Sequence, residues 1–288
     1  MSNLLRSLKR RFEISLFRHK GRIPSARSYA VCKNFYIERT IRDEDNLRVF
    51  QEELQLPSDF GTGFDERVIE YPWALSKLST YNEKCQFLDA GSTLNHEFIM
   101  RHPLVERQKW TILTLAPEAE CFCNLGVSYI YDDLRAMPFR DQCFDAVFSI
   151  SVIEHVGMDN TQYTRDAAYH TNRPQDYIRA INEMKRVLRS DGWLFLTVPF
   201  GQYEDHGWLQ QFDSAMLQDL VCQFQPKKEK RTFFRTTSHG WQTCAEEDCK
   251  YLTYRDSLKS KSSLINRKEN EVVPPVSATG LACVALQK

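Results

Sequence analysis

Short apolar runs alternate with longer polar or amphipathic stretches over most of this chain, and no other feature limits its possible folds as strongly. The apolar runs between residues 80 and 200 occupy 85–90, 110–115, 127–131, 144–151 and 192–199. Such alternation is typical of βαβ units, in which parallel strands are joined by crossover helices. It predicts an α/β fold built on a mostly parallel sheet.

Residues 177–188 form the clearest predicted crossover helix. Their apolar side chains recur with helical spacing, and the Ser-Asp-Gly sequence at 190–192 ends the pattern. Beyond residue 199 we expect a helix at 214–224, a strand around 231–236, a mobile surface loop at 259–271 and a last strand in the C-terminal apolar run. The two late strands would close one edge of the sheet.

The chain is neutral overall and of a length that suits one large domain with an appendage. Its 288 residues include 38 Lys and Arg against 38 Asp and Glu, so there is no global field to recruit bulk nucleic acid or another polyanion. Nine cysteines are scattered without the spacing of zinc ligand pairs, and no long apolar stretch opens the chain. These features predict a cytoplasmic protein with reduced thiols and no metal site.

The first 25 residues are basic and carry one apolar stripe, formed by Leu4, Leu8, Phe12 and Leu16 with Leu5 beside them. This spacing predicts an amphipathic helix. The helix would either pack on the domain, which we prefer because the stripe is narrow, or rest on a membrane or partner. Residues 30–60 have no clear period and are expected to be a lead-in. We therefore divide the chain into an N-terminal extension, 1–60, and a main domain, 61–288.

The run FLDAGSTLNHEF indicates a ligand site. It begins as a buried strand, reaches an acid at Asp89 and turns through Gly91, and ligands of open α/β sheets bind at the carboxyl ends of strands. A dinucleotide site would need the pattern G-x-G-x-x-G, whereas this loop has one glycine. A hydride-transfer enzyme is therefore the poorer fit.

Two further segments, DDLRAMPFRDQCFDAVFSISVIEHV and EMKRVLRSDGWLFLTVP, extend this pattern. With the loop above, in this order and spacing, the sequence resembles the class I S-adenosylmethionine-dependent methyltransferases of type 11 over roughly residues 65–215. The resemblance implies a Rossmann-like, doubly wound fold with a mostly parallel seven-stranded sheet and an antiparallel edge strand. It also implies S-adenosylmethionine as the cofactor and methyl transfer as the activity.

The same resemblance assigns residues to the cofactor. It implies that Asp89, Gly91 and Ser92 lie near the amino acid end, Asp133 and Leu134 at the adenine, and Ile150 and Ser151 beside the methionyl portion. A carboxylate at Asp89 suits an ammonium group through a charge-assisted hydrogen bond. Arg67, just before the first strand, would pair with the cofactor carboxylate or simply help to pack a helix.

The chain departs from the family pattern at two places. Thr93 and Asn95 replace the second and third glycines of the first loop. The acid that usually binds the ribose hydroxyls would fall at Thr114, so Glu118 or the backbone would have to hold the ribose.

Methyl transfer needs an acceptor aligned with the methyl–sulfur bond and, for an alcohol, a general base. Glu204, Asp205 and His206 follow the fifth predicted strand, and His206 is our first choice of base, with Asp205 beside it. His155 is the second choice, although the matching position is structural in many relatives. Hard oxygen ligands for a divalent ion exist, but nothing in their spacing requires one.

The predicted reaction is methyl transfer to a hydroxyl of a sugar, a glycan intermediate or a secondary metabolite. Nucleic acid is disfavoured, because the chain lacks the Pro-Pro-aromatic motif of base N-methylating enzymes. The alternatives are a noncatalytic binding or scaffold protein with this fold, motivated by Thr93, Asn95 and Thr114, and a methyltransferase for protein or peptide side chains. The sequence leaves the oligomeric state open.

Overall fold

The computed structural model describes residues 3–19, 28–256 and 276–288. The α-helices are α1 (Asn3–His19), α2 (Tyr29–Arg42), α3 (Glu44–Gln51), α4 (Arg67–Leu78), α5 (Glu97–Met100), α6 (Pro103–Glu106), α7 (Thr161–Thr164), α8 (Tyr177–Val187) and α9 (Ser214–Phe224). The strands are β1 (Gln86–Ala90), β2 (Lys109–Thr114), β3 (Ser128–Tyr131), β4 (Phe144–Ile150), β5 (Leu188–Pro199), β6 (Glu204–Asp205), β7 (Gln210–Gln211), β8 (Lys228–Thr237), β9 (Gly240–Cys244), β10 (Arg255–Asp256), β11 (Val276–Ser277) and β12 (Gly280–Gln287).

The main sheet has the strand order β3-β2-β1-β4-β5-β12-β8-β9 within the described residues. The first five strands of this order are parallel, and β12 runs antiparallel to both β5 and β8. The α/β, Rossmann-like fold is confirmed. The sheet has eight strands where seven were predicted, because β9 pairs antiparallel with β8 at the edge. A second antiparallel strand, β12, lies inside the sheet.

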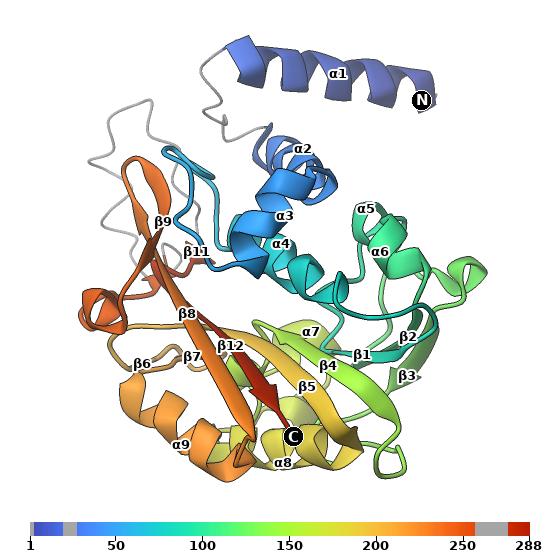
Figure 1. The fold of residues 1–288 in the computed structure, drawn as a ribbon, viewed down its shortest axis with the longest axis vertical. Coiled ribbons are helices and arrows are strands. Elements are labelled where there is room, and N and C mark those ends of the chain that lie inside the picture. The colour runs from blue at the N-terminus through green and yellow to red at the C-terminus, as the bar shows by residue number, and fades with distance from the viewer. Residues whose placement is uncertain (1–2, 20–27, 257–275) are drawn as a thin grey trace.

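Helices cover both faces of the sheet, with α8 and α9 on one side and α2, α3 and α4 on the other (Figure 1). Because successive side chains of a strand point to opposite faces, each central strand contributes side chains to the hydrophobic cluster on either face of the sheet. In β1, Phe87 belongs to the cluster on the α4 side and Leu88 to the cluster on the α8 side. Phe195 and Leu196 of β5 divide in the same way.

The N-terminal part of the chain is more regular than the sequence suggested. The lead-in expected at residues 30–60 contains the helices α2 and α3, which the sequence analysis did not predict. Their buried residues Cys32, Ile37, Ile41 and Phe50 belong to the same hydrophobic cluster as α4 and the sheet. The apolar residues of α2 alternate irregularly with polar and charged ones, so the period was unclear, and its buried residues join a cluster formed with elements distant in the sequence.

Most other predicted elements are confirmed. The predicted crossover helix is α8, the predicted helix at 214–224 is α9, and the two late strands are β8 and β12. The surface loop predicted at 259–271 lies outside the described residues. No helix in the described ranges has the length and apolar character needed to span a membrane.

Candidate functional site

A cavity of about 570 Å³ opens at the carboxyl ends of the parallel strands. After β1 the chain adds β2 and β3 on one side of β1, and it then crosses to the other side to add β4 and β5. Open α/β sheets bind ligands at the point where the strand order reverses in this way. Loops after β1, β2, β3 and β4 line the cavity, and α2 and α4 each add two side chains: Lys33, Asn34, Arg67 and Tyr71. The volume lies within the usual range of small-molecule sites.

The first loop brings backbone to the cavity wall through Gly91, which lines the cavity together with Ser92. Gly91 has a φ of 121°, and its amide donates to the carbonyl of Leu113 at 2.8 Å. A Cβ built on this residue would lie 2.3 Å from Cγ2 of Val152. Only glycine fits this position without displacing the neighbouring loop.

Asp89 lies beneath that loop rather than on the cavity surface. Its side chain is fully buried, and Oδ2 accepts a hydrogen bond from the amide of Leu94 at 2.9 Å. Oδ1 has no hydrogen-bond partner among the described residues. Burial raises the pKa of Asp89 to about 7, with a further contribution from the charge of Glu118. Its role at the cofactor ammonium stays a prediction.

The predicted adenine end of the cavity contains Asp133 and Leu134. Both carboxylate oxygens of Asp133 accept hydrogen bonds from the Arg135 guanidinium, which also donates to Asp176 at 2.6 Å. Although burial opposes it, the bonding to Arg135 holds the pKa of Asp133 below its usual range. An adenine amino group would thus meet an ionised carboxylate already oriented by Arg135, a lining residue that sequence reasoning missed.

The position of the missing ribose-binding acid, Thr114, and its proposed substitute, Glu118, both lie at the cavity. Thr114 ends β2, and Glu118 follows it on the loop; both line the cavity. Glu118 is half-buried, so its carboxylate is available to a ligand hydroxyl. The substitution of Thr114 for the usual acid therefore leaves a carboxylate within this part of the site.

Glu70, which the sequence analysis did not single out, joins three elements beneath the cavity. Its fully buried carboxylate pairs with Arg67 of the same helix. Oε1 also accepts hydrogen bonds from the hydroxyls of Ser151 at 2.5 Å and Thr197 at 2.6 Å. Arg67 and Ser151 line the cavity, so this bonding fixes two walls relative to each other.

We expect Glu70→Ala to lower the free energy of unfolding by about 2 kcal/mol, because several donors would lose a charged acceptor. Arg67 is 26% exposed and can partly rehydrate, which keeps the effect moderate. Urea unfolding measures the change. A matched control is Glu97→Ala, which removes an exposed helix pair with Arg101 and should change stability very little. Equal losses in the two variants would contradict this expectation.

Ile150 lies elsewhere than predicted. It is fully buried in the cluster on the α4 side of the sheet and is not among the lining residues. The reason is the alternation of β4, which turns Ile150 to the same face as Phe148. Ser151 and Val152 reach the cavity in its place.

His155 is the predicted general base that the structure brings to the cavity. Its Nδ1 donates to the backbone carbonyl of Trp208 at 2.9 Å, which leaves the lone pair on Nε2. Burial lowers the pKa of His155 to about 4, so the ring is neutral at physiological pH. Glu154 Oε1 lies 3.9 Å from Nε2, and burial raises the pKa of Glu154 well above its usual range, so this carboxyl adds no negative charge.

The structure places His206 and Asp205 away from the cavity lining. Both follow β5 in the β6–β7 hairpin. The ring of His206 packs 5.2 Å from that of Tyr254, and Tyr254 and Trp208 stand between it and His155. Following a parallel strand was the reason to prefer His206, but the hairpin turns it behind Trp208. The general-base role of His206 therefore lacks support from its position.

Several lining residues had no sequence signal. Lys33 and Asn34 come from α2, Tyr163 lies on α7, and Tyr169 and Thr171 lie on the chain between α7 and α8. The ring of Tyr163 meets that of His155 edge-on, with centroids 5.5 Å apart. Only an alignment of relatives could have indicated them before the structure.

Comparison with known proteins agrees with this geometry. Residues 111–196 match the family model described as "Methyltransferase domain". The matched segment runs from β2 to β5 and contains Asp133, Ser151 and His155.

The chain is also similar to curated proteins named "Probable tRNA methyltransferase 9B". It is 39% identical to the Mus musculus protein over 82 residues, which are 28% of this chain and 15% of that protein. It is 28% identical to the Homo sapiens protein over 154 residues, which are 51% of this chain and 30% of that protein. The chain thus spans less than a third of the length of these curated relatives.

Among solved structures, the chain resembles the Burkholderia thailandensis 1,6-didemethyltoxoflavin-N1-methyltransferase with bound S-adenosylhomocysteine. The TM-score is 0.46 at 13% identity, covering 76% of this chain and 78% of that one. The YcgJ protein of Bacillus subtilis gives the same TM-score and identity, covering 76% of this chain and 97% of that one.

The strand order, the glycine loop at the carboxyl end of β1 and the matched segment agree with one another. Residues 111–196 of this chain thus match a methyltransferase domain, and S-adenosylmethionine is the cofactor that such a domain uses.

Proposed function

We propose that this protein transfers a methyl group from S-adenosylmethionine to a hydroxyl of an acceptor held in the cavity. One observation carries the proposal: a single cavity, within a chain that matches the methyltransferase domain, is lined by Gly91, Asp133 and His155. The first two belong to predicted cofactor loops, and the third is a neutral imidazole suited to accept a proton.

The residues present fit the cofactor. The loop at Gly91 leaves no room for a Cβ, so its backbone can approach a ligand closely. Oδ1 of Asp89, which has no hydrogen-bond partner among the described residues, lies under the same loop. When bound, S-adenosylmethionine supplies a methyl group that its sulfonium makes electrophilic. Asp133 would hold the adenine end, Glu118 the ribose hydroxyls and the loop at Ser92 the amino acid end.

The chain's own contribution to the reaction is positioning and proton removal. The carbonyl of Trp208 holds Nδ1–H of His155 and so keeps the Nε2 lone pair available. Nε2 would take the proton of the acceptor hydroxyl as its oxygen attacks the methyl carbon in line with the methyl–sulfur bond. Tyr163 packs edge-on against this ring and limits its rotation.

The acceptor we favour is a sugar, a glycan intermediate or a secondary metabolite. Tyr163, Tyr169 and Thr171 line the side of the cavity near His155 and offer aromatic faces and hydroxyls to a polar, hydroxylated compound. A tRNA nucleoside is the second candidate, favoured by the names of the curated relatives. A protein side chain and a noncatalytic binding role remain the alternatives.

Two measurements on the full chain test this function. Calorimetry should detect S-adenosylhomocysteine binding at micromolar to submillimolar concentration, and no binding at millimolar concentration would remove the proposal. Incubation with methyl-labelled S-adenosylmethionine and separate pools of glycans, small metabolites, tRNA and proteins should then label one of the first two pools. Label in tRNA would favour the second candidate, and binding without any labelled pool would favour the noncatalytic role.

A further inference from the structure

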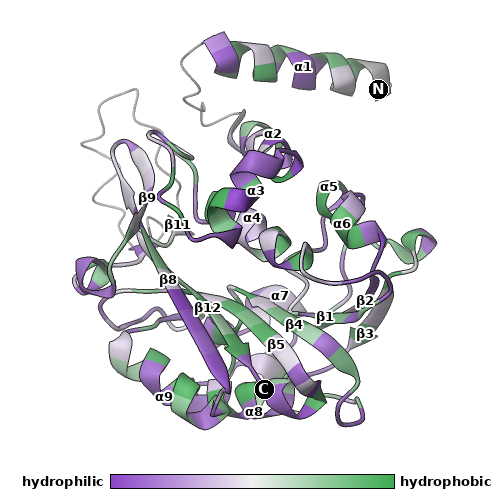
Figure 2. Ribbon diagram, in the orientation of Figure 1, coloured by the Kyte–Doolittle hydropathy of each residue, from purple (hydrophilic) through white to green (hydrophobic). Residues whose placement is uncertain are grey.

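Helix α1 exposes four large apolar side chains in one stripe. Leu5 and Leu8 are each 52% exposed, Phe12 is 69% exposed and Leu16 is 38% exposed. Their spacing of three and four residues puts them on one face of the helix. Single exposed apolar residues are ordinary, but a continuous stripe marks a surface that another body covers. Figure 2 shows α1 at the periphery of the molecule, with hydrophobic and hydrophilic residues alternating along it.

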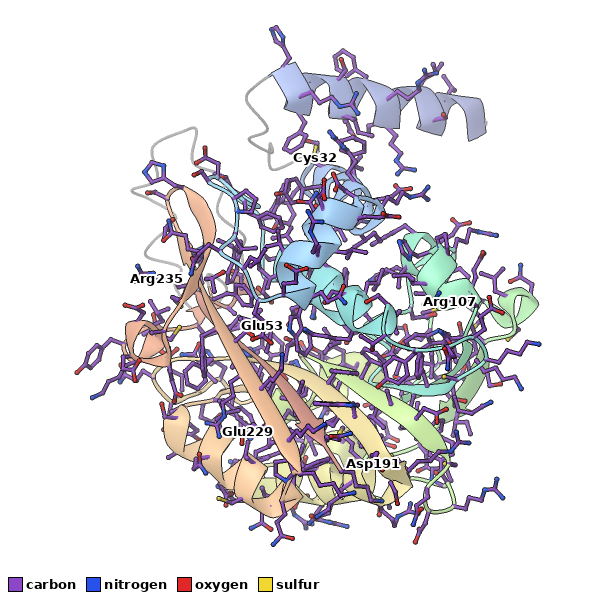
Figure 3. All side chains as sticks on the ribbon, viewed as in Figure 1. Cys32, Glu53, Arg107, Asp191, Glu229 and Arg235 are labelled. Atoms are coloured by element: carbon purple, nitrogen blue, oxygen red, sulfur yellow. The ribbon has the colours of Figure 1, made fainter. Side chains whose placement is uncertain are left out.

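The opposite face of α1 is already packed. Phe17 is 4% exposed and lies 5.7 Å from the ring of Phe64, and the Arg18 guanidinium lies 4.8 Å from the ring centre of Phe35 on α2. Cys32 of α2 is fully buried beneath the helix (Figure 3). Because these contacts hold α1 by one face, its apolar stripe faces away from the rest of the described chain. Helix α1 therefore packs on the domain, as we preferred, but it does so through Phe17 and Arg18 and not through the apolar stripe.

Charge is distributed unevenly along the chain. Residues 1–28 contain eight Lys and Arg and a single acid, Glu13. The rest of the sequence contains thirty Lys and Arg against thirty-seven Asp and Glu. The neutral total therefore combines a strongly cationic N-terminal segment with a mildly acidic remainder. Such a segment attracts anionic surfaces locally although the whole chain does not.

A groove between α1 and α2 gathers four arginines. Arg10, Arg11, Arg39 and Arg42 line a space of about 390 Å³, with Glu38 as the acid in its wall. Glu38 accepts a hydrogen bond from Arg10 at 3.3 Å and forms an ion pair with Arg42 at 3.2 Å, so this carboxylate is shared. Arginine binds phosphate oxygens through paired N–H donors. Arg11 also lies next to Phe12 in sequence, at the border between the groove and the stripe.

We propose that α1 docks this protein on a membrane surface that contains anionic phospholipid. The stripe of Leu5, Leu8, Phe12 and Leu16 enters the boundary between headgroups and acyl chains, and the exposed cations that flank it on α1, Lys9 and Arg11, bind lipid phosphates. The phosphates of a nucleic acid would pair with the basic side chains, but the four apolar side chains of the stripe would remain in water. A lipid surface satisfies both features at once.

Vesicle cosedimentation with the full chain tests this inference. Vesicles of phosphatidylcholine with about one third phosphatidylglycerol should bind the protein, and pure phosphatidylcholine vesicles should bind it much more weakly. The variant Leu8→Ser/Phe12→Ser should partition at least about tenfold less strongly into the anionic vesicles. The variant Lys9→Gln/Arg11→Gln should bind less strongly and depend less on salt.

A matched control is Leu54→Ser/Tyr251→Ser, which removes two apolar side chains exposed by 47% and 77% elsewhere on the surface. It should bind vesicles as the unaltered chain does. Thermal unfolding and S-adenosylhomocysteine affinity, which should be unchanged in every variant, exclude misfolding as the cause. The proposal is overturned if the stripe variant binds vesicles as well as the control does. It is also overturned if the chain binds a tRNA mixture but neither kind of vesicle.

Discussion

Gly91→Ala is expected to lose at least about a hundredfold in affinity for S-adenosylhomocysteine. Its methyl group would lie 2.3 Å from Cγ2 and 2.5 Å from Cγ1 of Val152, a separation that no packed pair of carbons tolerates. Because Gly91 has a φ of 121°, alanine also strains the backbone there. The first loop or the Val152 loop must then move, and both line the cavity. Isothermal calorimetry measures the loss.

Gly126→Ala is the matched control. Gly126 also has a positive φ, of 81°, but a Cβ there would meet nothing within 4 Å. It shares the backbone strain without the collision, so its cofactor affinity should stay unchanged. The double variant Gly91→Ala/Val152→Ala should recover part of the affinity, because the two colliding methyl groups are gone. Equal binding by the two single variants would refute the close packing of Gly91.

His155→Asn is expected to slow methyl transfer by about a thousandfold while S-adenosylhomocysteine affinity stays the same. Asparagine keeps a donor for the carbonyl of Trp208, so the local loop is retained, but it removes the basic ring nitrogen. Steady-state rates and calorimetry on the same preparation separate the two effects. His206→Ala is the comparison, and we expect it to leave the rate within a few-fold of the unaltered chain, because His206 is not a lining residue.

The pH profile gives a second readout of His155. Since burial lowers its pKa to about 4, the imidazole is neutral, and the rate should be level, from about pH 5 upward. Below that, protonation should reduce the rate about tenfold per pH unit. The free energy of unfolding depends on pH in the same direction, because His155 binds a proton more readily in the unfolded chain than in the folded one. The stability contributed by the neutral His155 is complete above about pH 6.5 and declines as the pH falls toward 4. A rate that drops already between pH 7 and 6 would assign the base to another group.

Local patterns predicted the central elements closely. The apolar runs became β1 to β5, and the helix at 177–188 became α8 within one residue, because strand and helix periods are local properties. The loop after β1 and the acid after β3 could likewise be placed on the cavity, because parallel strands end at one edge of the sheet. Gly91, Asp133 and Ser151 line one cavity, and their contacts with the cofactor stay predictions.

Other features depended on contacts between residues far apart in the chain. Helix α2 lacks a clear period, yet it packs into the core and brings Lys33 to the cavity. Glu70 looked like an ordinary helix acid until its bonds to Ser151 and Thr197 were known. Spacing along one segment says nothing of such partners.

The sequence by itself determined the mostly parallel sheet and the glycine turn at the carboxyl end of β1, because strand period and turn chemistry are local properties of the chain. Only the tertiary structure decided which histidine reaches the cavity and which face of α1 stays exposed. His155 and His206 both follow a sheet strand, and it is the packing of Trp208 and Tyr254 between them that leaves one in the site and the other behind it. The spacing of apolar residues likewise shows that one side of α1 is apolar. The contact of Phe17 with Phe64 holds the helix by its other side, so the apolar side faces outward.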